Sequence, residues 1–77
     1  MSLQSLSHAF AITKNDNANL AQSTRGIYVG AAGDLKIDTT NGDTVTLVGL
    51  AAGVVHPIAA KKVYSTGTTA TGIVGLY

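Results

Sequence analysis

The dipeptide Asn41-Gly42, which separates two alternating runs, constrains the fold more than any other feature of this sequence. Before it, Leu35 and Ile37 alternate with Lys36 and Asp38, the period-two pattern of a half-buried strand. After it, residues 44–50 form a second such run, because the chain continues there with residues that favour strands. An Asn-Gly pair joins such strands through a type I′ turn, in which both central residues have positive φ. The sequence therefore predicts a hairpin whose return strand carries two sets of side chains on opposite faces: Val45 and Leu47, and Thr44, Thr46 and Val48.

The rest of the chain also favours strands over helices. Gly and Thr are abundant, Glu is absent, and the apolar residues are mostly Val, Ile and Ala. Strands are predicted at 9–13, 26–30 and 72–77, and residues 54–64 are predicted to be extended. Loops or turns are predicted at 15–19, 31–33, 51–53 and 65–71, where Asn, Gly, Ala and Thr cluster. Five or six short strands with turns about every ten residues predict an all-β fold, a small antiparallel β-sandwich or barrel.

We expect a single β domain over residues 1–77, since the chain has room for only one. Residues 1–18 form either an extended N-terminal arm or the first strand and its loop. Two segments are candidate sheet edges. Pro57 cannot donate to a ladder, so the 54–64 segment is an edge, or is bulged or broken there. The apolar last strand, 72–77, must be covered or becomes an adhesive edge.

The small size of the chain indicates that it works with partners. A domain this small buries only about 60% of its unfolded surface, so external support is expected. The chain has no cysteine, which excludes disulfides and thiolate zinc sites. Charged residues make up 12% of the chain and the net charge is +1, which is too little for binding nucleic acid or anionic membranes. No segment is long and apolar enough to span a membrane, so we expect a soluble protein that associates with other proteins.

No motif predicts catalysis, a metal or a cofactor. His8 and His56 lie in different predicted strands and lack ligand spacing. The four aspartates lie in or beside predicted turns, which explains them without an acid–base role. The Asn-rich loop at 15–19 lacks the central Gly and terminal acid of an EF-hand, and residues 67–72 lack the Lys of a phosphate loop.

A carbohydrate- or surface-binding module is the main alternative to an assembly protein. Such sites present aromatic platforms, for which the chain offers only Phe10, Tyr28, Tyr64 and Tyr77. Basic residues offer a different kind of contact. Lys61 and Lys62 are adjacent in a predicted strand, so we expect them to face opposite ways and to protect an edge or contact an acidic partner.

Several stretches together resemble small virion proteins of tailed phages and gene transfer agents. The resemblance begins with Thr24-Arg25-Gly26-Ile27-Tyr28-Val29-Gly30 and Gly33-Asp34-Leu35. It continues with Ala52-Gly53, Pro57, Lys61-Lys62-Val63 and Gly67-Thr68-Thr69-Ala70, and it closes with Gly72-Ile73-Val74 and Tyr77. The sequence is most similar to the spike-base family of gene transfer agents and related phage head proteins, over residues 19–77. It departs from the family at Ile58-Ala59-Ala60, where members tend to have Val-Arg-Val.

The resemblance implies a non-enzymatic protein of the capsid surface, made in the host cytoplasm. Its implied partners are the major capsid protein, further copies of itself in a pentamer or trimer, and a head fibre. A tail or adaptor position is an alternative within the same class. No cofactor is implied. The candidate assembly contacts are Arg25, Tyr28, Pro57, Lys61, Lys62, Tyr64, Ile73, Leu76 and Tyr77.

Overall fold

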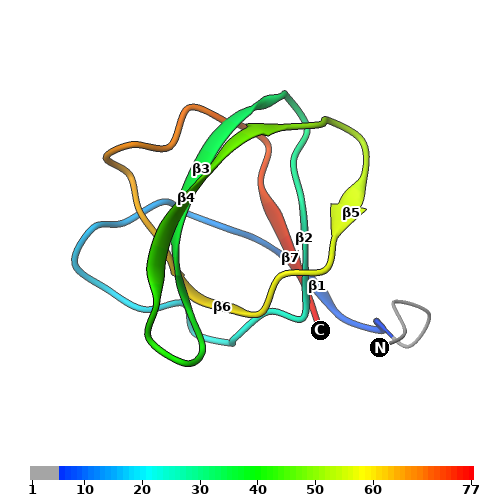
Figure 1. Cartoon of the computed structure of the whole chain (residues 1–77). Helices are drawn as coiled ribbons and strands as arrows, with labels where there is room; N and C mark the ends of the chain where they lie inside the picture. Colours follow the sequence, from blue (N-terminus) through cyan, green and yellow to red (C-terminus); the bar gives the residue numbers. More distant parts are fainter. Residues whose placement is uncertain (1–5) are drawn as a thin grey trace.

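The computed structural model describes residues 6–77, which form seven β-strands and no helix. Figure 1 shows the strands wrapped around a common interior. Their bounds are β1 Ala9–Ala11, β2 Gly26–Tyr28, β3 Gly33–Thr39, β4 Thr44–Leu50, β5 Val55–His56, β6 Ala60–Val63 and β7 Val74–Leu76. They pair into two antiparallel sheets, with the orders β1-β7-β2-β5 and β4-β3-β6. The prediction of an all-β antiparallel fold is confirmed.

The β3–β4 hairpin is where the sequence predicts it, but its turn is of another type. Only Gly42 has a positive φ, of 96°, and Asn41 does not, so the predicted type I′ turn is wrong. The backbone N–H of Gly42 donates to the Thr39 carbonyl at 2.9 Å, and the Thr39 N–H donates to the Asp43 carbonyl at 2.8 Å. These bonds define a three-residue loop with Gly42 in the left-handed region. The hairpin places Val45 opposite Ile37 and keeps the predicted faces of β4.

The extended segment at 54–64 is broken at its proline, one of the outcomes predicted for it. Pro57 separates β5, an edge of the four-stranded sheet, from β6, an edge of the three-stranded sheet. The chain thereby passes from one sheet to the other without a regular turn, as the yellow segment of Figure 1 shows.

The prediction that the last strand is a sheet edge is wrong. β7 lies inside the four-stranded sheet and pairs with β1 on one side and β2 on the other. The neighbouring strands could not be assigned from periodicity, because β1 and β2 come from the distant N-terminal third of the chain. The apolar strand is therefore covered by its own chain.

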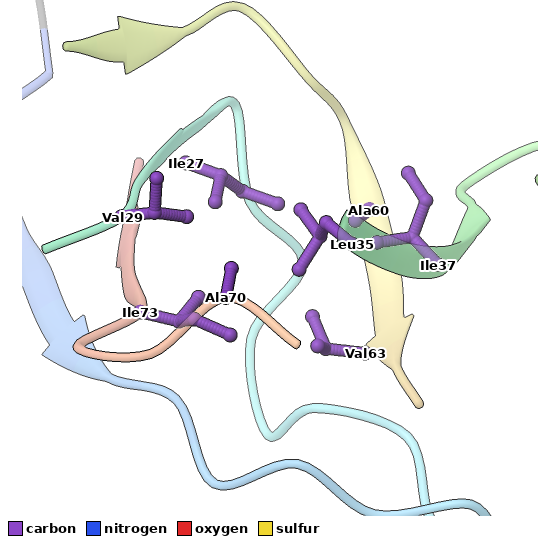
Figure 2. Packing of buried hydrophobic residues seen from close by; sticks show 8 residues of the cluster. All are labelled: Ile27, Val29, Leu35, Ile37, Ala60, Val63, Ala70 and Ile73. Carbon is purple, nitrogen blue, oxygen red and sulfur yellow. The ribbon is translucent and has the colours of Figure 1, made fainter. Parts of the chain in front are cut away.

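One hydrophobic core joins the two sheets (Figure 2). Its members are contributed by β2 and the residue after it, β3, β6 and the C-terminal segment: Ile27, Val29, Leu35, Ile37, Ala60, Val63, Ala70 and Ile73. Gly75 permits close packing beside this core, because a Cβ there would lie 2.8 Å from the Phe10 ring and 2.8 Å from the Thr24 methyl.

The buried Thr24 hydroxyl links the two sheets at the edge of this core. Thr24 is 1% exposed, and its Oγ1 donates to the Ile58 carbonyl at 2.9 Å and accepts from the Ala60 N–H at 3.0 Å. Its backbone N–H also donates to the Ala60 carbonyl at 2.9 Å. One side chain thus satisfies two backbone groups where the strand pairing is interrupted around Pro57.

Candidate assembly surfaces

The nine residues predicted as assembly contacts do not form one surface. Ile73 is 5% exposed and belongs to the core, so in the single chain it packs inward. Leu76 is half-buried in the interior strand β7. Arg25 and Pro57 are exposed, whereas the remaining predicted contacts are half-buried: Tyr28, Lys61, Lys62, Tyr64 and Tyr77.

The ring of Tyr77 packs against two rings from the N-terminal part of the chain. Tyr77 stacks on His8 with 4.9 Å between ring centroids, and it meets Phe10 edge-on at 5.8 Å. The backbone of Tyr77 also exchanges hydrogen bonds with His8, at 2.9 and 3.0 Å. These contacts hold the N-terminal strand against the end of the chain.

A basic cluster surrounds Tyr64 on the three-stranded sheet. The ammonium groups of Lys36 and Lys62 lie over its ring, 4.8 and 4.7 Å from the centroid. Such cation–π contacts hold the two charges in defined positions. The Tyr64 hydroxyl donates to the Asp38 carboxylate, whose two oxygens are each 3.0 Å away. The cluster joins β3 and the end of β6.

Lys61, which precedes Lys62 on β6, lies at an irregular position of that strand. Ala60 and Val63 are both buried although they are three residues apart, which strict alternation does not permit. A register shift opposite Asp38 and Thr39 absorbs the extra residue as a bulge. The bulge removes the strict alternation on which the prediction that Lys61 and Lys62 face opposite ways rests. The positive charges of both lysines act on Asp38.

The Asp38 carboxylate is stabilised in its charged form. A hydrogen bond from the Thr44 hydroxyl is the main cause that holds the pKa of Asp38 below its ordinary value of 3.8. The Tyr64 hydrogen bond and the charges of Lys62 and Lys61 act in the same direction. Asp38 thus feels the positive charges of Lys61 and Lys62, whereas Lys36, over the same Tyr64 ring, acts on Asp16.

Asp16 has a structural role in the Asn-rich loop. Its carboxylate accepts the hydroxyl and backbone N–H of Thr66, at 2.6 and 2.9 Å, and the N–H of Ser65 at 2.8 Å. The Thr66 bonds are the main cause that lowers the pKa of Asp16 below 3.8. The aspartate therefore ties the 15–19 loop to the loop after β6. Spacing alone gave no signal for this pairing, because the partners are 50 residues apart.

An open groove of about 360 Å³ lies between the β3–β4 hairpin and the segment that follows β5. Pro57, Ile58 and Ala59 line one side. Val45 and Leu47 of β4 are part of the other. Three large apolar residues, Val45, Val48 and Val54, are 40%, 78% and 49% exposed. Val48 lies on β4 and Val54 directly before β5, and neither lines the groove. The groove is apolar along most of its walls, with Asp43 as its charged residue.

Within residues 6–77, no group of three or more His, Cys, Asp or Glu side chains converges on a point that could hold a metal ion. His56 Nε2 lies 3.0 Å from the Ala51 carbonyl, a local contact between loop and strand. In that same part of the chain, no helix is long and apolar enough to cross a membrane.

Comparison with known proteins identifies one informative relative. No protein-family model matches the chain, and no curated protein sequence matches it. Among solved structures, it is similar to a chain from the capsid of a native GTA (gene transfer agent) particle computed with C5 symmetry. The two chains are 36% identical and superpose with a TM-score of 0.85, over 100% of this chain and 90% of the other. This chain therefore belongs to the family of that gene transfer agent capsid component.

Proposed function

We propose that this protein is a non-enzymatic structural component of a virion, either of a tailed phage or of a gene transfer agent. In this role it binds the major capsid protein at the capsid surface, as a head decoration or the base of a vertex spike, and it self-associates there. The observation that carries the proposal is the full-length similarity to a chain of a gene transfer agent capsid. The small all-β domain and its low charge support the same role.

The basic cluster around Tyr64 is the proposed capsid-binding surface. Two of the five Lys and Arg residues of the chain, Lys36 and Lys62, lie over the Tyr64 ring, and a third, Lys61, acts with Lys62 on Asp38. Because the Tyr64 ring holds two of the ammonium groups in place, less side-chain entropy is lost when an acidic surface binds them. We therefore expect the complementary surface on the capsid to be acidic.

The alternative of a carbohydrate-binding module receives less support from the same cluster. A sugar-binding site needs an open aromatic face, and the Tyr64 ring is covered by two ammonium groups. Tyr77 is likewise engaged with His8 and Phe10. Binding to a glycan array that is lost in Tyr64→Ala would favour the alternative.

Co-sedimentation with capsids that lack the protein tests the proposal. The wild-type protein should bind at a fixed copy number per particle, and cryo-electron microscopy should show it at a symmetry axis of the outer surface. Lys36→Glu/Lys62→Glu should weaken binding, and the loss should grow smaller as salt is raised, because salt screens exposed charges. Lys14→Glu/Arg25→Glu is the matched control, since it makes the same charge change at two basic residues outside the basic cluster. If the wild-type protein did not co-sediment with capsids at any salt concentration, the proposed function would be refuted.

A further inference from the structure

The free edge of β4 is a long strand edge without the usual protection. Its seven residues contain no charge and no proline, although natural edge strands usually carry one or the other, or are very short. A bulge near Gly33 and Leu35 disturbs only its C-terminal end. The Thr39 N–H donates to the Asp43 carbonyl, so the alternation of the antiparallel ladder directs the backbone groups of Thr44 and Thr46 away from β3. This edge, together with the apolar groove beside it, is a template for one more strand.

The other long edge of the same sheet is already covered. β6 accepts hydrogen bonds on its free side from the N–H of Asn15 to Val63, at 3.0 Å, and from the N–H of Leu20 to Lys61, at 2.7 Å. β5 is only two residues long and is followed by Pro57, which cannot donate. Neither strand offers a matching free edge to a second copy.

The remaining edge is β1, and it matches β4 in chemistry. His8 and Tyr77 form a mutual hydrogen-bonded pair, and the Ile12 N–H donates to the Ile73 carbonyl. The alternation of an antiparallel ladder then directs the backbone groups of Ala9 and Ala11 away from β7. Both side chains are exposed and small, and β1 contains no charge. Among residues 6–77, no backbone hydrogen bond uses the outward groups of these residues, so the two uncharged edges can pair without burying an unpaired charge.

We propose that the β1 edge of one copy pairs with the β4 edge of the next copy, which joins the four-stranded sheet of one to the three-stranded sheet of the other. The new strand would cover the exposed valines of β4 and border the groove. This inference rests on the proposed function, which includes self-association at the capsid surface. A contact between two different edges is heterologous and can close into a ring, whereas β4 against β4 would stop at a two-fold dimer.

Engineered disulfides test this contact, since the native chain has no cysteine. Ala9 and Thr46 are both exposed, and they lie directly opposite each other when the two edges pair antiparallel with Ala9 beside Thr46 and Ala11 beside Thr44. In a paired ladder their Cα atoms would lie about 5.5 Å apart, within the range that a disulfide spans. Under mild oxidation, the double variant Ala9→Cys/Thr46→Cys should form a covalent ladder of dimers, trimers and larger oligomers on a non-reducing gel.

The single variants and a distant pair decide between the possible contacts. Thr46→Cys alone should stay monomeric on the gel, and a covalent dimer would overturn the proposal in favour of β4–β4 pairing. Ala32→Cys/Thr46→Cys, with the first cysteine on an exposed loop, should give no ladder. Thr46→Lys should abolish self-association while circular dichroism shows an intact fold, because Thr46 is exposed. A native oligomer that neither cross-links nor responds to Thr46→Lys would also overturn it. Capsid binding is scored separately, so failure of this contact leaves the proposed function standing.

Discussion

Thr24→Val should destabilise the protein strongly although it changes almost no volume. Valine keeps the methyl beside Gly75 and removes only the hydroxyl. The Ala60 N–H then loses its acceptor and the Ile58 carbonyl loses a donor, in a place where Thr24 is 1% exposed. Each buried unsatisfied group costs about 1–3 kcal/mol, so we expect a loss of about 2–5 kcal/mol in the free energy of unfolding.

Thermal and urea unfolding measure this loss. For a domain of this size, a loss of about 2 kcal/mol lowers the Tm by about 8–16 °C. Thr24→Ser keeps the hydroxyl and removes the methyl, so it should cost only about 1 kcal/mol, the value of one buried methyl group. The order of the two variants is the informative result, because cavity formation and hydrogen-bond loss predict opposite orders.

Thr69→Val is the matched control for hydrogen-bond loss at the surface. The Thr69 hydroxyl accepts the Asp34 N–H at 2.9 Å, but Thr69 is exposed, so water can replace it. Its cost should stay below about 1 kcal/mol. If Thr24→Val proved no more costly than Thr24→Ser or Thr69→Val, the argument that the hydroxyl joins the two sheets would be refuted.

Three further outcomes are expected from the same structure. The folded pKa of Asp38 lies below its ordinary 3.8, so its charge stabilises the fold above that pH, and this stabilisation disappears as pH falls through the folded pKa. Asp38→Asn should therefore make the midpoint of urea unfolding less dependent on pH below about 4. An unchanged pH profile would contradict this. Gly75→Ala should cost about 1–3 kcal/mol in chemical denaturation, because the new Cβ would lie 2.8 Å from the Phe10 ring. Deletion of residues 73–77 should abolish folding, as judged by near-ultraviolet circular dichroism, because β7 is an interior strand; a folded truncated protein that merely fails to assemble would show the strand to be an edge after all.

Local patterns in the sequence were enough to predict the fold class and most of the strands. The alternation at 35–38 and 44–50 fixed the hairpin and its buried face, because a period of two leaves only one side for the core. Pro57 marked the break between β5 and β6, because proline cannot donate to a ladder. The turn type was missed because Asn-Gly fits a three-residue loop as well, once Gly42 alone takes the positive φ.

The candidate surfaces depended on which distant segments meet, and short-range patterns do not carry that information. Tyr64 lies beside Lys36 and Asp38 only because β6 pairs with β3, and a bulge in that pairing brings Lys61 toward them. The Thr24 hydroxyl likewise finds its partners 34 and 36 residues away.

The sequence by itself determined that this protein is a small, weakly charged β domain without cysteine, suited to assembly. Only the tertiary structure decided which strands are edges. An apolar strand has the same residue pattern whether it is covered by its own chain or by a partner. The order of strands in the two sheets placed β7 inside and left β4 free. That order follows from long-range pairing, whose energy is distributed over segments far apart in the chain and leaves no local signature.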